Sequence, residues 1–455
     1  MVLYATVCCM IVLIIAIIME KNIYNPLAVL SGIWMCLFYF QSLALHGLYP
    51  TSDSTYSMMI VGIISFACGY CAFRYQKTKR VQLLVGTKVI HESTRKQRFV
   101  LRNKALYVCC LLCICFYLID LFRIAPTLIS GGLSAVRATC QDPNSSFYAS
   151  RSSVESLMRT LFVGPFSFAL LPITAVNFFS TKRDLKLMMY CILIIGLRVL
   201  TEGGRSVVAY FMLHLVLVFF LTGKKGYRDR LKNEFGSLIE SWRNSKKKRR
   251  MLCCCLVILV IVGAAVLYES TISRSGADAA IHMYFYVAMQ GQMFEIWANK
   301  VEASGLMGFG LASLNGFLYP IIYVFKNLMG YSEFPGYWGE IINIIQATDS
   351  EWQWMSSYGR ANAFVSLFWF FYLDGRLIGI IAGMFLYGMT CSKCYRLAIT
   401  EANDRAMCFV ILVIQGLMFS MVRMQFSNLY YAQAFIWIAL VHRRDYSTST
   451  DVIER

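Results

Sequence analysis

Long runs of apolar residues limit what this chain can fold into more than any other feature of its sequence. The first run, Val2–Met19, contains no charged residue, and runs of similar length recur along the 455 residues. As a helix, such a run crosses most of a hydrocarbon core about 30 Å thick. Since no water in that core bonds to the backbone, a helix that satisfies its own peptide groups is favoured. The sequence therefore predicts an all-α, polytopic membrane protein, a single helical bundle over residues 1–455.

Eleven runs are expected to span the membrane, and composition agrees, because 58% of the residues are hydrophobic and only 15% are charged. These runs are Val2–Met19, Tyr24–Leu45, Tyr56–Phe73, Ala105–Phe122, Leu157–Phe179, Leu187–Leu200, Val207–Leu221, Met251–Leu267, Leu377–Cys391, Ala406–Met421 and Leu429–Val441. The first run has no basic segment before it and no cleavage site after it, so we expect a retained span. Two shorter runs, Leu314–Leu328 and Ala361–Leu373, either span or form re-entrant or interfacial helices. The total expected is about 11–13 transmembrane helices.

Lysine and arginine collect beside these runs, and their positions predict the orientation of the chain. The segments 74–104, 182–186 and 224–250 are strongly basic, and pairs of expected spans separate them, so all three fall on one side. Basic loops stay in the cytoplasm, which places the N-terminus and the loop around His46 outside. These loops account for much of the formal net charge of +18, and we expect no nucleic-acid partner.

The segment Glu269–Arg360 is predicted to be a large external loop, periplasmic or extracellular. Its acidic residues outnumber its basic residues, and no other external segment is long enough to hold a structured element. Of the 17 cysteines, only Cys140 falls in an external loop, so no disulfide framework is expected there. The sequence shows no phosphate-binding glycine loop and no zinc motif, so we expect neither metal nor cofactor.

Charged residues at the external membrane boundary are the candidate functional residues, because an ionisable group there is costly and usually has a partner or a ligand. Arg198 and Glu202 are four residues apart and can pair on one helix face. Arg205 follows Gly203 and Gly204, which permit a sharp turn, and it begins the next span. Its guanidinium either snorkels to lipid phosphates or makes a bidentate contact with a substrate phosphate.

Further arginines flank the external loops. Arg274 and Arg360 stand near the two ends of the long loop, and each is either an interfacial anchor or a contact for an anionic ligand. The earlier external loop, expected between Arg123 and Glu155, contains Arg137. Several arginines at one boundary favour an anionic ligand there.

Two histidines also merit attention. His282 is the only histidine of the long loop, and it is either a packed side chain or a general base that titrates near neutral pH. His214 lies within an expected span and is predicted to form an interhelical hydrogen bond.

Two short motifs and the layout of the chain resemble the Wzy-type polymerases, which join oligosaccharide repeat units in bacterial O-antigen and capsule assembly. The first motif is Gly203-Gly204-Arg205-Ser206 at the start of a span. The second follows the long loop and runs from Asn362-Ala363-Phe364 through Tyr372-Leu373-Asp374-Gly375 into Ile378-Gly379-Ile380-Ile381-Ala382-Gly383. The family more often has Asp, an aromatic residue and Gly, whereas here Gly375 and Arg376 follow Asp374 directly. Asp374 is therefore expected to be a turn or cap residue.

The resemblance implies a reaction and a location. Such an enzyme polymerises undecaprenyl-diphosphate-linked repeat units into O-antigen or capsular polysaccharide by glycosyl transfer, on the outer face of the bacterial plasma (inner) membrane. Positive charge stabilises the departing diphosphate, a role expected for Arg205, Arg274 and Arg360. A base must accept the proton of the acceptor hydroxyl, and His282 is the candidate.

The resemblance also implies binding residues and partners. Arg137, Arg198 and Glu202 are expected to bind the substrate. The implied partners are the lipid-linked oligosaccharide, membrane lipid, a chain-length regulator and a flippase. Two alternatives stay open, an O-antigen ligase and a lipid-linked oligosaccharide flippase or other transporter. A transporter usually shows internal repeats, and none is visible here.

Overall fold

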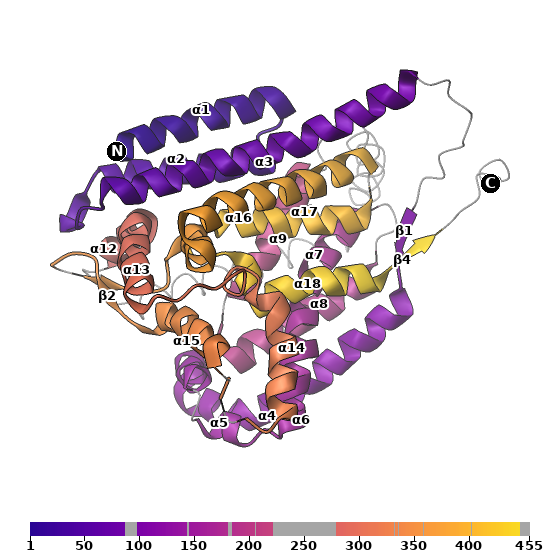
Figure 1. The fold of residues 1–455 in the computed structure, drawn as a ribbon. Coiled ribbons are helices and arrows are strands. Elements are labelled where there is room, and N and C mark those ends of the chain that lie inside the picture. Colours follow the sequence, from indigo (N-terminus) through magenta and orange to yellow (C-terminus); the bar gives the residue numbers. More distant parts are fainter. Residues whose placement is uncertain are drawn as a thin grey trace, which may run out of the picture.

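The computed structural model describes residues 1–86, 98–142, 145–180, 184–204, 206–221, 279–331, 333–334, 336–357, 359–401 and 403–445. Within these residues the fold is all-α, with two small two-stranded sheets (Figure 1). The first half contains helices α1 (Val2–Glu20), α2 (Pro26–Ser42), α3 (Asp53–Gly86), α4 (Asn103–Gln141), α5 (Ser146–Ala149), α6 (Ser153–Met158), the π-helix η2 (Arg159–Val163), α7 (Gly164–Phe179), α8 (Leu185–Glu202) and α9 (Ser206–Leu221).

The second half of the chain adds helices and the short strands. These elements are α12 (Ala279–Ala288), α13 (Gln290–Ser304), α14 (Asn315–Leu328), α15 (Gly336–Ser350), α16 (Ser366–Glu401), α17 (Asp404–Met418), the 3₁₀ helix η4 (Gln425–Ser427) and α18 (Leu429–Val441). Strand β1 (Arg98–Leu101) pairs with β4 (His442–Asp445), and β2 (Gln353–Trp354) pairs with β3 (Arg360–Ala361), both antiparallel.

Five helical segments are long and apolar enough to cross a membrane. They are Val2–Glu20, Asp53–Arg74, Asn103–Cys140, Ser153–Phe179 and Ser366–Ile399. Shorter apolar helices cover Pro26–Ser42, Ser206–Leu221 and Leu429–Val441. Every expected span within the described residues therefore coincides largely with helix, whereas the span expected at 251–267 lies outside them.

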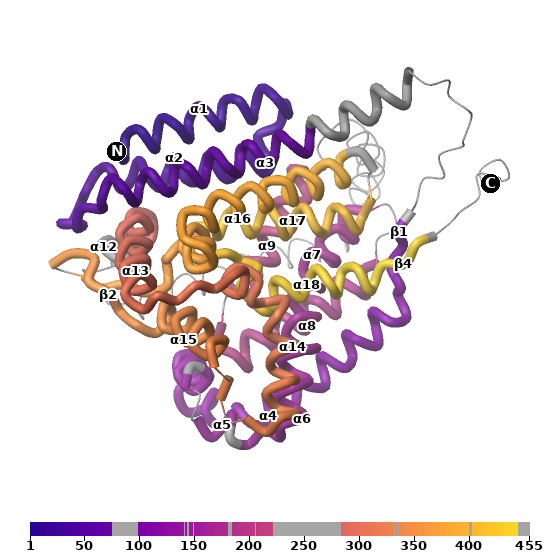
Figure 2. The backbone as a smooth tube through the Cα atoms, in the orientation of Figure 1, coloured from indigo at the N-terminus to yellow at the C-terminus, as the bar shows by residue number. Residues whose placement is uncertain are grey.

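Helix α7 is the centre of the bundle. All its residues from Gly164 to Val176 are buried, and it packs against α8, α9, α17 and α18. In Figure 2 the label of α7 lies among those of α8, α9, α17 and α18. A helix that is apolar on all sides and covered all round is expected at the core of a bundle rather than on its surface.

Different parts of the chain meet at the two ends of the apolar part of α3. On one side, the end of α1 meets the ends of α3 and α16, where Arg74 donates to the Met19 carbonyl at 3.1 Å and Arg396 pairs with Glu20 at 2.7 Å. On the opposite side, the Ser52 amide donates to Glu295 of α13 at 2.8 Å. Helices α12 to α15, from the predicted external loop, gather on this second side (Figure 1), here called the long-loop side.

The expectation that the segment between Arg123 and Glu155 holds no structured element is wrong. Helix α4 continues as far as Gln141, and α5 and α6 follow at once. The helix is interrupted at Gly132, whose φ of 66° lies in the left-handed region that glycine adopts without steric cost. The apolar run ends at Phe122, but the helix continues past Pro126 and Gly132, because Ile124 and Val136 are buried against Phe147 of α5.

The expected run Ala361–Leu373, from Ser366 onward, and the expected run Leu377–Cys391 belong to one element, α16, with a break at Gly375 and Arg376. The two parts turn back on each other. A Cβ added to Gly379 would lie 2.1 Å from the Phe371 carbonyl oxygen, and one on Gly383 would lie 2.2 Å from the Phe371 ring. Only glycine permits this close approach, so the hairpin-like bend depends on both residues.

Helix α14 corresponds to the other short run, Leu314–Leu328. It packs on α18, where Gln433 donates to the Gly316 carbonyl at 2.9 Å, and it runs across the direction of α3 and α16 (Figure 1). Ile321, Phe325 and Leu328 are exposed on it. Its course favours an interfacial helix over a spanning one.

Candidate functional site

Seven charged side chains near the long-loop side of the bundle form five ion pairs, and we call them the charged network. Four of these pairs are linked through shared residues, and Arg123 and Glu155 form the fifth. The seven side chains come from α4, α6, η2, α8 and the turn before α6. Its members are Asp120, Arg123, Arg151, Glu155, Arg159, Arg198 and Glu202.

Arg159 is the centre of this network because it contacts two carboxylates from different helices. One guanidinium nitrogen pairs with Asp120 of α4, and Nη2 lies 3.1 Å from Oε1 of Glu202 at the end of α8. Arg198 completes the cluster, with Nε 2.8 Å from Oε2 of Glu202. The predicted pairing of Arg198 and Glu202 on one helix face is therefore confirmed.

Two further ion pairs join α4 to α6 and to the turn before it. Arg151 Nη2 lies 3.0 Å from Asp120 Oδ1, and Arg123 Nη2 lies 2.9 Å from Glu155 Oε1. The local sequence explains the position of Glu155, because Ser152 and Glu155 form a capping box that starts α6. Burial lowers the pKa of the Arg151 guanidinium from its ordinary 12.5, although it stays charged at neutral pH.

The network has more positive than negative charge. It contains four arginines and three carboxylates, so the net charge of these seven side chains is +1. Arg198 also lies 5.6 Å from the ring centre of Tyr430 at the start of α18, and its Nη1 lies 3.4 Å from Ser167 Oγ. Buried charges require partners, and the ion pairs within the network supply them. The surplus charge makes this region attractive to anions.

Among the predicted substrate-binding residues, Arg137 lies apart from these pairs. It is exposed on α4, and a Cβ added to Gly203 would lie 2.8 Å from its backbone nitrogen. Gly203 has a φ of 61° and ends α8, so the ends of α4 and α8 touch at this glycine.

The predicted catalytic residues are only partly placed. Arg205 and Arg274 lie outside the described residues. His282 belongs to α12, and the structure describes only the backbone of this residue. Arg360 is exposed on β3, with its guanidinium 4.9 Å from the Trp354 ring centre. Figure 1 shows β2 and β3 well separated from α6, so the structure does not bring Arg360 together with the charged network.

Sequence reasoning missed two charged residues that the structure makes prominent. Asp120 interrupts the run Ala105–Phe122, and an acidic residue within such a run was itself a signal for a buried partner. Arg423 is the only charged residue between α17 and α18, and it pairs with Asp349 of α15. His214 is placed as predicted, with Nε2 2.7 Å from Gln415 Oε1 of α17.

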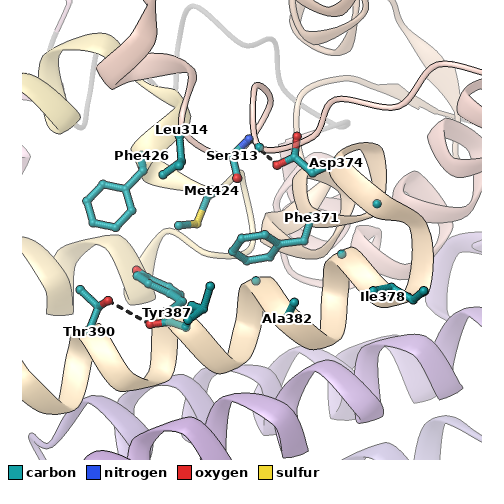
Figure 3. A pocket seen from close by; sticks show the side chains of 15 residues that line it. Ser313, Leu314, Phe371, Asp374, Ile378, Ala382, Tyr387, Thr390, Met424 and Phe426 are labelled. Carbon is teal, nitrogen blue, oxygen red and sulfur yellow. Dashed lines mark hydrogen bonds between the residues drawn. The ribbon is translucent and has the colours of Figure 1, made fainter.

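Asp374 anchors a loop, in agreement with its predicted role as a turn or cap residue. Its Oδ1 accepts the Ala312 amide and its Oδ2 accepts the Ser313 amide, both at 2.9 Å. Figure 3 shows Asp374 beside Ser313. A Cβ added to Gly308 would lie 2.4 Å from Asp374 Oδ1, so glycine is required where the loop wraps the carboxylate. The negative charge is therefore met by backbone donors.

Arg376, on the other side of the bend in α16, contacts the start of the same loop. Its Nε lies 2.9 Å from Glu302 Oε1, and it donates to the carbonyls of Leu306 and Val301 at 2.8 and 3.2 Å. Together with Asp374, Arg376 ties the end of α13 and the following loop to the bend.

A cavity of about 440 Å³ runs along α16 beside this loop, and we call it the α16 groove. One wall is the face of α16 between Gly375 and Thr390. The other walls come from Phe371, the loop 310–314 and the η4 region (Figure 3). Its lining is largely apolar, so it suits a hydrocarbon better than a sugar.

Among the described residues, no three His, Cys, Asp or Glu side chains are grouped so as to hold a metal ion. The chemistry visible in this part of the chain is thus that of arginine, carboxylate and an apolar groove. Comparison of the chain with protein-family models, with curated proteins and with solved structures finds no match.

Proposed function

We propose that this chain is an integral membrane protein that polymerises lipid-linked oligosaccharide repeat units on the outer face of the bacterial plasma membrane. The five long apolar helices and the two-sided arrangement of helix ends support the membrane part of the proposal. Under this proposal the side with the basic termini of α3 and α16 faces the cytoplasm, and the long-loop side faces outward.

The observation that carries the proposed reaction is the charged network. Four arginines and three carboxylates gathered in an apolar bundle cost desolvation energy, and such groups are kept where they serve an ion or a substrate. Tyr430 connects Arg198 to α18, which packs against α14 of the long loop. The network is thus joined, through Tyr430 and α18, to α14 of the predicted external loop.

The proposed transfer breaks the bond between the sugar carbon and the lipid diphosphate and forms a new bond to an acceptor hydroxyl. The leaving diphosphate takes the bonding electron pair, and nearby guanidinium groups lower the barrier by stabilising its charge. The hydroxyl proton passes to a base, for which His282 is proposed. Arg205, which precedes α9 in the sequence, is the proposed contact to the diphosphate.

Glycan analysis of a deletion strain tests this function. We expect single repeat units to replace polymer, with recovery on complementation by the full chain. Carrier-linked polymer that never reaches its acceptor would instead identify a ligase. Unpolymerised repeats trapped on the cytoplasmic face would identify a transporter, and unchanged polymer length would contradict all three.

A further inference from the structure

Three tyrosine rings lie beside the three arginines that are linked in the charged network. The guanidinium carbon lies 5.6 Å from the ring centre in the pair Arg159 and Tyr117, 5.0 Å in the pair Arg151 and Tyr148, and 5.6 Å in the pair Arg198 and Tyr430. A cation is attracted to the face of an aromatic ring, so the rings help to hold these arginines in place. The three tyrosines differ in what their hydroxyl groups contact.

Two of the three hydroxyl groups are bonded within the protein. The Tyr117 hydroxyl lies 3.2 Å from Ser167 Oγ, and the Tyr148 hydroxyl donates to the Cys140 carbonyl at 2.7 Å. The Tyr430 hydroxyl has no hydrogen-bond partner in the described part of the chain. It is not enclosed, since Tyr430 is half-buried and its oxygen is not among the buried side-chain atoms that lack a partner. This hydroxyl can therefore donate to a ligand.

The position of the Tyr430 hydroxyl is fixed by the start of α18 and by a glycine. Asn428 caps the helix by accepting the amides of Tyr430 and Tyr431 at 3.0 and 3.2 Å. A Cβ added to Gly164 would lie 2.4 Å from Tyr430 Cε1 and 2.6 Å from Cζ, the carbon that bears the hydroxyl. The phenol can lie against the start of α7 only because Gly164 has no side chain.

Tyr430 interacts with both ends of the linked part of the charged network. This part contains Arg151, Arg159 and Arg198 but only two carboxylates, so its net charge is +1. Arg151 and Arg198, at its two ends, both interact electrostatically with the Tyr430 phenol. The Arg151 side chain is only 5% exposed, and its Nε has no hydrogen-bond acceptor among the residues that the structure describes. A buried donor without an acceptor is destabilising, so an anion that accepts hydrogen bonds is favoured here.

We propose that Tyr430 is a substrate-contact residue, and that its hydroxyl donates a hydrogen bond to a phosphate oxygen of the substrate diphosphate. The inference rests on the proposed function for the identity of the anion. A phosphate group offers several acceptor oxygens, which a phenol and guanidinium groups can share. The phenol keeps its proton throughout. Its hydrogen bond strengthens as negative charge develops on the leaving diphosphate, so Tyr430 adds to the stabilisation that the arginines supply.

Removal of a single oxygen atom tests this contact. The full-length protein in phosphatidylcholine nanodiscs is titrated with inorganic pyrophosphate in a calorimeter at constant ionic strength. Tyr430→Phe keeps the ring against Gly164 and Arg198 but loses the donor, and its affinity for pyrophosphate should fall at least about tenfold. Its midpoint of thermal unfolding without pyrophosphate should not change, since no described residue bonds to the hydroxyl.

Tyr148→Phe is the matched control. It removes a hydroxyl that is already bonded to the Cys140 carbonyl and leaves the ring beside Arg151, so its affinity for pyrophosphate should equal that of the wild type. A second arm separates the two sources of phosphate. Glycerophosphoglycerol, the head group of a phospholipid, should compete with pyrophosphate only weakly if the contact serves a diphosphate.

Four outcomes would overturn the proposal: no binding of pyrophosphate to the wild type, equal affinities of Tyr430→Phe and the wild type, an equal loss in Tyr148→Phe, or lower thermal stability of Tyr430→Phe without pyrophosphate. Strong competition by glycerophosphoglycerol would overturn the assignment to substrate and give the contact to lipid head groups.

The polymerase and the contact can fail separately. Weaker pyrophosphate binding by Tyr430→Phe, in a protein whose deletion leaves polymer length unchanged, would uphold the contact and overturn the polymerase. Loss of polymer on deletion, together with full affinity of Tyr430→Phe, would uphold the polymerase and overturn the contact.

Discussion

Arginine performs three distinct tasks at the scale of single residues. Arg159 joins helices by contacting carboxylates of α4 and α8. Arg376 holds backbone carbonyls and a carboxylate at the bend in α16. Arg423 ties the segment between α17 and α18 to α15 by pairing with Asp349. The planar guanidinium suits all three because its donors point in several fixed directions, which a lysine ammonium cannot reproduce.

Arg205→Ala should abolish polymer while leaving single repeat units and a normal amount of protein in the membrane. A charge-assisted contact is worth roughly 1.5–3 kcal/mol, and more if it strengthens as the diphosphate leaves. Arg205→Lys keeps the positive charge but cannot make the bidentate contact of a guanidinium with a phosphate, so it should retain little activity. Glycan chain length in complemented deletion cells measures the effect, with Arg443→Ala, exposed at the opposite side, as control. Normal chain lengths with Arg205→Ala would contradict this role.

The burial of His442 leads us to expect that the protein loses stability as the pH falls. It is 4% exposed, its ring Nδ1 lies 2.7 Å from the Ile438 carbonyl, and burial lowers its pKa to about 4. The unfolded chain binds a proton at higher pH, near 6.5, so stability should fall as pH drops from about 6.5 to about 4, by up to about 3 kcal/mol.

Thermal unfolding of the detergent-solubilised protein between pH 7 and pH 4 checks the role of His442. His442→Asn keeps a donor near the position of Nδ1 but does not titrate, so its loss of stability in acid should be smaller than that of the wild type. An identical pH slope in the two proteins would show that His442 does not contribute.

At the scale of elements, the bend in α16 organises the candidate site. Arg376 adopts a φ of 55°, which costs on the order of 1–3 kcal/mol for a residue with a side chain. The contacts of its guanidinium with Glu302, Leu306 and Val301 offset this strain. The bend turns Phe371 onto Gly383 and places Asp374 beside the loop at Ala312, so it shapes the groove as well.

Two glycines on α16 should respond differently to alanine. At Gly379 the added Cβ meets a backbone oxygen at 2.1 Å, so we expect a loss of about 1–3 kcal/mol. This steric cost outweighs the stabilisation of about 1 kcal/mol that alanine brings through its higher helix propensity. At Gly375 no atom lies within 4 Å of the added Cβ and the backbone is extended, so Gly375→Ala should change stability by less than about 0.5 kcal/mol. Thermal unfolding in detergent compares them, and equal stabilities would contradict the proposed packing.

At the scale of the whole molecule, two faces with different chemistry define the architecture. One face collects the ends of α1, α3 and α16 with their basic residues. The other carries α12 to α15, the charged network and the Asp374 end of the groove. Helix α7 lies buried between them and keeps the surrounding helices in register.

Cysteine labelling in intact cells tests the orientation of these faces. In a background without native cysteines, Ser304→Cys should react with an impermeant thiol reagent, because Ser304 is exposed at the end of α13 on the long-loop side. Asn244→Cys and Arg443→Cys should be shielded until the cells are opened. Labelling of either shielded position in intact cells would reverse the orientation and place the proposed site on the wrong face.

The sequence alone determined the long apolar helices, because apolar runs are local signals and an apolar segment must satisfy its own peptide groups. It also indicated the pair Arg198 and Glu202, which share one helix face. It did not indicate that Asp120 meets Arg159, or that Asp374 holds amides 61 and 62 residues away. Those contacts depend on which helices pack together and how α16 bends. Tertiary structure alone decided them, since pairing of distant side chains is set by packing geometry and not by local periodicity.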